Sequence, residues 1–340
     1  MRCLSLADAL KARGAKVQFV CRYLPEHISV SMIAKEYQVV RLSPANWPEP
    51  SSDSLTHAQW LGTSQAEDAA ATTRAISDKE CDWLVVDHYA LDANWERAMR
   101  RSVKRILALD DIADRQHDCD ILLDQNLYPN MGARYSEKVR SGCRMLLGPH
   151  YALLRHEFHQ LRQRTRPRAW PVSRVLLFFG GVDATSYTSV AIEALDEATV
   201  RGMNVDVVIG AEHPNRKQIQ AACSERRFEC HVQSHRMAEL MAAADLALGA
   251  GGSATWERCC LGLPTLIVTL AENQTAIARS LDLAGAGVYI GSYKTADVGV
   301  IRRSLLELFE HPNRLKALSE KAYSLVDGLG AFRVCEELGI

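Results

Sequence analysis

The sequence predicts an α/β protein made of two doubly wound, Rossmann-type domains that face a cleft. Short apolar runs of strand length alternate with helical patterns along the 340 residues, which is typical of parallel sheets covered by helices on both faces. The alternation restarts after an Arg- and Pro-rich stretch at 160–171, which we interpret as an exposed linker. A chain of this length commonly forms two domains. We therefore expect an N-terminal domain at 1–165 and a C-terminal domain at 172–340.

The N-terminal domain is predicted to start with a helix. Apolar residues recur at helical spacing in residues 1–13, and Gly14 is a typical helix end. Prolines mark a loop at 44–53. The other patterns predict strands at 17–21, 38–42, 83–87, 105–109, 121–123 and 143–148, and helices at 56–79 and 94–102.

The start inside a helix leaves two alternatives open. A parallel sheet grows by strand–helix–strand units, so a first strand is expected before this helix. Either the helix begins the protein, or a strand and its loop, about 20 residues on typical lengths, precede Met1.

The C-terminal domain repeats the alternation. Apolar runs predict strands at 175–179, 205–210, 228–232, 245–248, 265–268 and 288–290. Helical patterns lie at 187–197, 216–224, 237–244 and 276–284, with two further helices within 297–327 and a last one at 332–338.

Composition and charge exclude several classes of protein. The net charge of −1 argues against a nucleic-acid-binding surface as the main function. No apolar run approaches the ~20 residues of a membrane-spanning helix, so we expect no membrane insertion. The ten cysteines form no C-x-x-C pair, which favours a reducing, cytoplasmic setting without structural zinc.

The stretch 248–274 carries the strongest functional pattern. Three glycines, at 249, 251 and 252, end a strand, and a helix follows that we expect Ser253 or Thr255 to cap. Glycines before a helix expose backbone N–H groups to an anionic ligand, and Glu257 in the first turn could accept bonds from sugar hydroxyls. Asn273 and Gln274 follow the next strand, where open α/β sheets bind ligands. The alternative is an ordinary strand-to-helix turn.

Other strand ends offer weaker candidates. Gly180-Gly181 could hold a phosphate or form a simple tight turn. Asp87-His88-Tyr89 could face the cleft or be a half-buried strand end. Asp110-Asp111 could bind a metal, although acidic strand ends more often cap the next helix. His156 and His159 are expected to be solvated on a polar helix.

An ordered set of motifs resembles a known family. The motifs are Met1–Ala7, Asp87-His88-Tyr89, Asp110-Asp111, Leu122–Asn126, Tyr151–Phe158, Gly180–Asp183, Gly249–Glu257, Gly262-Leu263-Pro264 and Glu272-Asn273-Gln274. The last three resemble the nucleotide-sugar site of two-domain GT-B proteins such as the MurG glycosyltransferase. The whole set is similar to the UDP-2,4-diacetamido-2,4,6-trideoxy-β-L-altropyranose hydrolases of pseudaminic acid biosynthesis, the PseG family.

The resemblance implies a reaction and a division of roles. Water attacks the anomeric carbon of a UDP-linked sugar and UDP leaves, without metal or cofactor. The C-terminal domain would bind the nucleotide-sugar. By similarity, Glu257 would hold the uridine ribose, and Ser253 and Ala254 would lie near the nucleotide. Gly180, Gly181 and Asp183 would lie near the diphosphate. Asn273, Gln274 and Tyr89 would face the sugar and the water, and Arg155 and Asn126 would make lesser contacts.

The chain departs from the family at one place. The family's general base is a histidine in a Gly-x-Gly-His loop directly before the segment that matches Met1–Leu4. We hypothesise that Met1 is internal to the natural protein; a chain this short should hydrolyse far more slowly, because general-base help contributes ~10²–10⁴-fold. Two other functions remain open: a GT-B glycosyltransferase that uses a UDP-sugar, and a UDP-binding pseudoenzyme.

Overall fold

The computed structural model describes residues 1–43, 55–77, 80–168, 171–196 and 202–340. The loop expected at 44–53, residues 78 and 79 of an expected helix, linker residues 169 and 170, and the expected helix end at 197 lie outside these ranges. The chain forms two compact units. Unit 1 comprises residues 1–126, 130–153 and 331–340, and unit 2 comprises residues 127–129 and 154–330. The domain limits at 165 and 172 stay a prediction.

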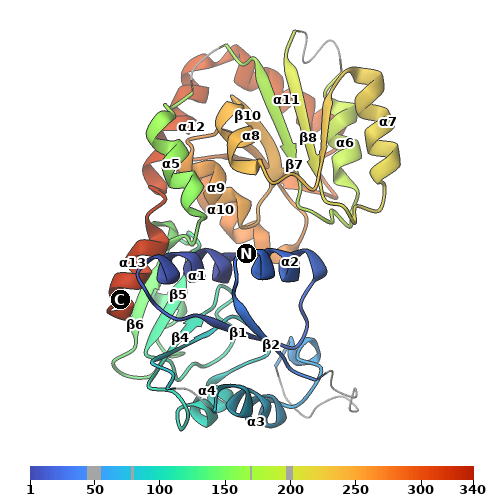
Figure 1. Ribbon diagram of the computed structural model, residues 1–340. Helices are drawn as coiled ribbons and strands as arrows, with labels where there is room; N and C mark the ends of the chain where they lie inside the picture. The colour runs from blue at the N-terminus through green and yellow to red at the C-terminus, as the bar shows by residue number, and fades with distance from the viewer. Residues whose placement is uncertain (44–54, 78–79, 169–170, 197–201) are drawn as a thin grey trace. The chain divides into compact units, whose positions relative to one another are not determined.

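Unit 1 contains parallel strands in two separate sheets (Figure 1). One sheet has the order β1-β2 and the other the order β3-β4-β5-β6. The strands are β1 (Gln18–Cys21), β2 (Gln38–Arg41), β3 (Trp83–Val86), β4 (Arg105–Leu109), β5 (Ile121–Asp124) and β6 (Arg144–Leu147). The helices are α1 (Arg2–Ala12), α2 (Glu26–Ala34), α3 (Gln65–Ile76), α4 (Ala93–Met99) and α13 (Gly330–Leu338).

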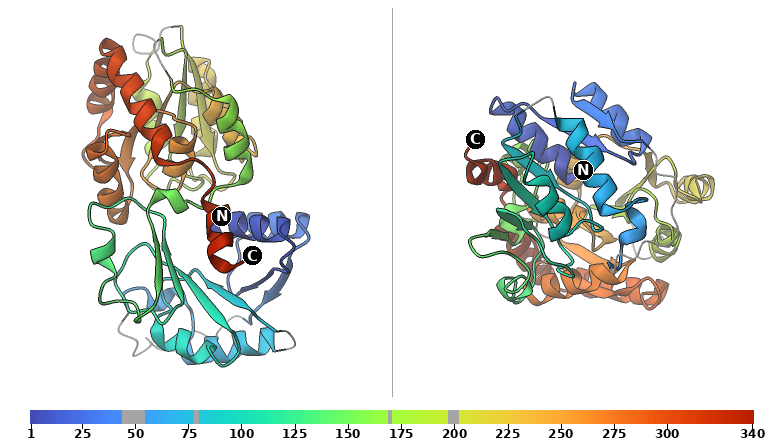
Figure 2. Two further views of the ribbon diagram at one scale, coloured as in Figure 1. Left: turned by 90° about the vertical axis from the view of Figure 1, so that its left-hand side faces the viewer. Right: turned by 90° about the horizontal axis from the view of Figure 1, so that it is seen from below.

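Helices cover both faces of the β3–β6 sheet. Leu107 and Leu123 pack on the side of α1 and α13, whereas Ile106 and Leu122 pack on the side of α3 and α4. This alternation is what a strand buried on both faces requires. The first and last helices of the chain, α1 and α13, lie side by side, because they share one apolar cluster and Arg13 donates to the carbonyl of Phe332 (Figures 1 and 2).

In unit 1 one predicted helix starts later than expected and one helix was not predicted. The helix expected at 56–79 starts only at Gln65, after a 3₁₀ turn at Ala58–Trp60. Gly62 adopts φ +72°, and Ser64 forms a capping box with Glu67, which together fix the later start. Helix α2 was missed, because its first turn has no side-chain cap and its apolar residues are not clearly periodic.

Unit 2 has one parallel sheet with the order β12-β11-β10-β7-β8-β9. Its strands are β7 (Arg174–Phe178), β8 (Asn204–Ile209), β9 (Glu229–Val232), β10 (Leu246–Ala250), β11 (Thr265–Thr269) and β12 (Val288–Ser292). Its helices are α5 (His156–Arg164), α6 (Tyr187–Ala194), α7 (Arg216–Arg226), α8 (Met237–Ala243), α9 (Ala254–Cys260), α10 (Thr275–Leu283), α11 (Val298–Glu310) and α12 (Pro312–Leu325). The predicted strands and helices of this half are confirmed to within a few residues.

The strand order reverses between β7 and β10. The chain runs outward through β8 and β9, returns to β10, and then continues on the other side through β11 and β12. Such a switch point leaves an opening at the carboxyl ends of the two central strands, where α/β sheets bind ligands. The core of the sheet is apolar; Leu177, Val207, Leu248 and Val268 are fully buried.

Candidate functional site

Neighbouring strands of unit 2 end beside one another and carry most of the predicted site. β7 pairs with β10, and β10 pairs with β11, all in parallel. Their carboxyl ends therefore share one edge of the sheet. Gly180-Gly181 follows β7, Gly251–Ala254 follows β10, and Asn273-Gln274 follows β11. The structure thus brings these three predicted segments together.

Close packing shapes the turn after β10. A Cβ on Gly249 would lie 2.7 Å from the carbonyl oxygen of Phe178 and 2.8 Å from Nη1 of Arg258, so only glycine fits there. The N–H of Gly251 donates to the carbonyl of Val268 at 3.2 Å. These contacts fix the backbone at the end of the strand.

Backbone N–H groups are free in this turn. The amides of Gly252, Ser253 and Ala254 donate no hydrogen bond to any residue that the structure describes. Ser253 occupies the N-cap position of α9, but its side chain does not cap the helix, and the hydroxyl of Thr255 accepts from Arg258 instead. The predicted side-chain cap is therefore wrong. Successive free amides in a turn form a set of donors suited to an anion or a carbonyl oxygen.

Glu257 is held close to Arg155. Nη2 of Arg155, the residue before α5, lies 3.6 Å from Oε1 of Glu257 in the first turn of α9. The same guanidinium contacts Glu157 at 2.7 Å. Burial raises the pKa of Glu257, and the charges of Arg155 and Arg258 only partly oppose it. The carboxylate is partly accessible and suited to accept bonds from hydroxyl groups.

Asn273 and Gln274 differ in their surroundings. The side-chain oxygen of Gln274 accepts from the N–H of Leu270 at 3.0 Å, and its Nε2 lies beside Gly252. Gln274 therefore links the turns after β10 and β11. The Asn273 side chain is exposed and makes no polar contact with the described residues. It is free to bind a ligand.

Hydrogen bonds to neighbouring segments fix the Gly180-Gly181 turn. Gly180 adopts φ +101°, and the carbonyl of Gly181 accepts from the N–H of Gly210 at 2.9 Å. Asp183, predicted near a diphosphate, is buried, and its oxygens accept from the backbone N–H groups of Tyr187 and Thr188 at 3.1 and 2.8 Å. In this structure its carboxylate anchors the turn to the start of α6.

Tyr89 belongs to a charged cluster in unit 1. Its hydroxyl donates to Oδ1 of Asp111 at 2.7 Å, and Arg2 reaches Oδ2 of the same carboxylate at 2.9 Å. Arg2 also forms a fork with Asp87, at 2.6 and 3.1 Å. The thiol of Cys3 donates to Asp87 at 3.1 Å. The cluster joins the carboxyl ends of β3 and β4 to the first residues of α1.

These contacts set the protonation states of the cluster. Burial, and then the charge and hydrogen bond of Asp111, raise the pKa of Tyr89, so its hydroxyl remains a donor at neutral pH. Burial alone would raise the pKa of Asp87, but the hydrogen bond and charge of Arg2 hold it below its usual range. Asp87 and Arg2 are therefore both charged at neutral pH.

Asp110 and Asp111 do not act as a metal-binding pair here. Asp110 is buried, accepts from the N–H of Ala113 at 2.9 Å and forms an ion pair with Arg115 at 2.9 Å, while Asp111 faces Tyr89. The alternative expectation, that this strand end caps the next helix, is wrong as well, because no helix lies in the described residues between β4 and β5; Asp110 accepts from the N–H of Ala113 in the connecting turn instead.

Asn126 follows the end of β5 in unit 1. It is buried, and its N–H donates to Oδ1 of Asp124 at 3.0 Å. Burial raises the pKa of Asp124 to about 7 against the opposing effects of the Asn126 amide and Arg134.

His159 does not behave as predicted. The residue was expected to be solvated, but its Nδ1 lies 3.1 Å from the carbonyl of Asp327. The expectation was wrong because the sequence does not show that the segment after α12 returns to α5.

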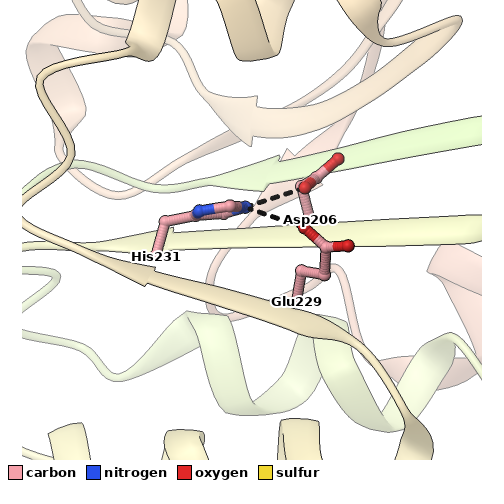
Figure 3. A group of neighbouring side chains, drawn as sticks. All are labelled: Asp206, Glu229 and His231. Atoms are coloured by element: carbon pink, nitrogen blue, oxygen red, sulfur yellow. Dashed lines mark hydrogen bonds and ion pairs between the residues drawn. The ribbon is translucent and has the colours of Figure 1, made fainter.

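One group of potential metal ligands lies among the described residues. Asp206 on β8 and Glu229 and His231 on β9 meet with Nε2 of His231 at 2.8 and 3.8 Å from the two carboxylates (Figure 3). An imidazole and two carboxylates can bind a divalent metal. However, Arg174 contacts Asp206 at 3.2 Å and already offsets its charge. The group also lies within the strands rather than at their carboxyl ends, so we interpret it as an ion-pair cluster.

Two features of these sites were not predicted from the sequence. The ion pair of Arg2 and Asp111 was missed, because only the fold brings residues 109 positions apart into contact. Arg258 was also missed, although an arginine among Trp256, Cys259 and Cys260 is a detectable signal of a buried charge.

The geometry defines the class: an α/β protein with the GT-B glycosyltransferase fold. Residues 175–329 match the family model "Glycosyltransferase family 28 C-terminal domain". The crystal structure of MurG from Acinetobacter baumannii superimposes with a TM-score of 0.65 at 12% identity, covering 99% of this chain and 95% of that one. The expected fold is confirmed. None of the described helices is long and apolar enough to cross a bilayer.

Two curated relatives are similar over most of the sequence. The spore coat polysaccharide biosynthesis protein SpsG of Bacillus subtilis (strain 168) is 24% identical over 265 residues, 77% of each protein. The UDP-2,4-diacetamido-2,4,6-trideoxy-beta-L-altropyranose hydrolase of Campylobacter jejuni is 24% identical over 212 residues, 62% of this chain and 74% of that protein.

Proposed function

We propose that this protein hydrolyses UDP-2,4-diacetamido-2,4,6-trideoxy-β-L-altropyranose. Water attacks the anomeric carbon, the bond from that carbon to the diphosphate oxygen breaks, and the free sugar and UDP are released. The observation that carries the proposal is the set of free amides at 252–254 beside Glu257, at the switch point of the unit 2 sheet. Similarity to the C. jejuni hydrolase supports the choice of substrate.

The nucleotide would be bound at the turn after β10. Glu257 accepts hydrogen bonds from the ribose hydroxyls, and Arg155, 3.6 Å away, favours the charged form of its carboxylate and orients it. The amides of Ser253 and Ala254 donate to the nucleotide. Gln274, already bonded to Leu270, keeps this turn in register with the end of β11.

The diphosphate would lie over the ends of β7 and β10. The amides of Gly180 and Gly181 donate to no described residue. Asp183 fixes their turn by accepting from the N–H of Thr188 in α6. Preorganised amides stabilise the charge that develops on a leaving diphosphate, which is the largest electrostatic demand of the reaction.

Asn273 and Tyr89 would serve the sugar and the water. Asn273 is exposed and unbonded, so its amide can bind either one. Tyr89 is protonated and can donate a hydrogen bond, but it cannot remove a proton from water in this state. Asn126 and Arg155 are assigned lesser contacts. We assign no general base among the residues that the structure describes.

A glycosyltransferase is the second candidate function. The match of residues 175–329 to the family 28 C-terminal domain favours it, because the same donor site would serve transfer to an acceptor. In hydrolysis water attacks the anomeric carbon, whereas in transfer the acceptor attacks it.

The test is a single-turnover incubation of excess protein with the altrose-configured sugar nucleotide in ¹⁸O-labelled water, without acceptor. The proposal expects UDP release and ¹⁸O at the anomeric position of the free sugar. Label in UDP would mean cleavage at phosphorus and would overturn it. Release only after an acceptor is added would establish transfer instead. UDP binding by calorimetry without any turnover would support a pseudoenzyme, and absence of UDP binding would reject all three functions.

A further inference from the structure

Arg258 is a buried cation with an incomplete set of partners. Arg258 belongs to α9, the helix that follows the turn after β10, and only 2% of the residue is exposed. Nη2 donates to the carbonyl of Ala250 at 2.7 Å and to Oγ1 of Thr255 at 3.1 Å. Nε and Nη1 have no partner among the described residues, and no described carboxylate lies within 4.0 Å of the guanidinium. Leaving a buried donor without a partner is unfavourable, because the group has lost its hydrogen bonds to water.

Arg168 is a buried arginine of the same unit in which every guanidinium nitrogen has a hydrogen-bond acceptor. Its Nε donates to the carbonyl of Ala244 at 3.1 Å, its Nη2 to those of Met241 and Ala242 at 3.0 Å each, and its Nη1 to that of Leu261. Those bonds close the end of α8 and explain why Arg168 is buried. Arg258 uses one of its three nitrogens, so local structure alone does not account for it.

The position of Arg258 relates it to the ligand edge of the sheet. A Cβ on Gly249 would come within 2.8 Å of Nη1 and within 2.7 Å of the Phe178 carbonyl. The guanidinium therefore lies against the last residues of β10, beside the end of β7. These are the two strands between which the strand order reverses. The two glycine turns, at 180–181 and 251–252, follow these strands directly.

The surroundings keep the charge of Arg258 in place and strengthen its field. Burial lowers the pKa of Arg258 to about 10, so the group is still cationic at neutral pH. The nearby charge of Glu257 acts on Arg258 without forming an ion pair with it. A buried charge without an ion-pair partner acts over several ångströms, farther than an exposed one. The bond to Ala250 has a second effect, because it fixes the peptide that precedes the free amides of the turn.

We infer that Arg258 is a positioning residue that makes the site prefer a nucleoside diphosphate over the nucleoside alone. Arg258 would not contact the ligand. It would hold the carbonyl of Ala250, and its positive charge would attract the diphosphate across the backbone of the turn. The inference rests on the proposed function and adds a residue to its site. The three N–H groups on Nε and Nη1 have no partner among the described residues, so no local bond draws on the charge that faces the turn.

The test compares the affinities of UDP and uridine for wild type, Arg258→Met and Arg258→Lys by calorimetry at constant ionic strength. We expect wild type to bind UDP at least about tenfold more tightly than uridine. Arg258→Met should lose most of this ratio with little change in uridine affinity, whereas Arg258→Lys should keep part of it. Arg168→Met is the matched control: it should lower the melting temperature and leave the UDP/uridine ratio unchanged.

The outcomes separate this inference from the proposed function. Equal affinities of wild type for UDP and uridine would overturn the inference without any variant, so it stays testable if Arg258→Met fails to fold. A folded Arg258→Met protein with the wild-type ratio would also overturn it. If Arg258→Met weakens UDP and uridine equally, its role is structural and the inference fails. Wild type that binds neither ligand would refute the proposed function itself.

Discussion

The hydroxyl of Tyr89 lies 2.7 Å from Oδ1 of Asp111, and Arg2 holds the other oxygen of that carboxylate at 2.9 Å. The tyrosine is thus oriented by a carboxylate that is itself held in place by an ion pair. Because Arg2 also bonds Asp87, rotation of any one side chain would break contacts of the others. The cluster gives Tyr89 one preferred direction, as a positioned catalytic donor requires.

We expect Tyr89→Phe to lower single-turnover hydrolysis about tenfold, the typical value of one hydrogen bond made in the transition state. UDP affinity should stay within about threefold, because the nucleotide contacts are assigned to unit 2. Tyr293→Phe is the control, since Tyr293 is 39% exposed and has no role in the site. Wild-type turnover in Tyr89→Phe would remove Tyr89 from the mechanism.

Glu257→Gln should weaken UDP binding about tenfold, because a carboxylate accepts ribose hydroxyls more strongly than a neutral amide. The affinity of wild type should also fall on acidification. Since burial raises the pKa of Glu257, this loss should begin at a higher pH than an ordinary glutamate would give. Calorimetry between pH 5 and pH 8 measures both effects. Glu320→Gln, a change at an exposed ion pair, is the control; identical profiles for both variants would contradict the ribose assignment.

The neighbouring residues Asn273 and Gln274 should respond differently to alanine. Asn273→Ala should lower turnover and leave the melting temperature unchanged, because the side chain is exposed and unbonded. Gln274→Ala removes the acceptor of the Leu270 N–H and should cost about 1 kcal/mol of stability. Thermal denaturation and single-turnover assays on both variants check this. A destabilised Asn273→Ala protein would show that the residue serves the fold.

Local patterns were sufficient to predict where strands end. Apolar runs indicate β7, β10 and β11, and the segments after them follow directly, so Gly180, Ser253 and Asn273 are identified as candidates from the sequence alone. The same signals could not predict what touches these residues. The free amide of Ser253 depends on turn geometry, and the importance of Arg258 depends on its depth and missing partners, which no local pattern reports.

One miss was local: the helix start at Gln65 depends on a capping box and was predictable in principle. Contacts across long sequence separations explain the other misses. The division of unit 1 into two sheets was not predictable, because β1 and β3 pack in separate clusters against α1 and form no ladder with each other. In the same way, Arg2 and Asp111 come together only through the placement of α1 over β4.

A buried histidine in unit 1 should make stability depend on alkaline pH. Nδ1 of His117 lies 2.8 Å from Glu96, and its Nε2 lies 3.7 Å from Asp110. Burial alone would lower the pKa of His117, but its interactions with Asp110 and Glu96, a close contact with the first and a hydrogen bond with the second, raise it to about 9. A group whose pKa is raised on folding stabilises fully below its unfolded value, about 6.5, and loses that effect as pH rises through about 9.

We therefore expect the stability advantage of wild type over His117→Gln to shrink by about 2–3 kcal/mol between pH 6 and pH 10. Chemical denaturation of both proteins across this range measures the difference, and other groups that titrate in this range cancel because they are common to both. His235→Gln, a change at an exposed histidine, should show no such trend. A constant difference between wild type and His117→Gln would mean that His117 is neutral in the folded protein, and the ion-pair interpretation of its contacts with Glu96 and Asp110 would then be wrong.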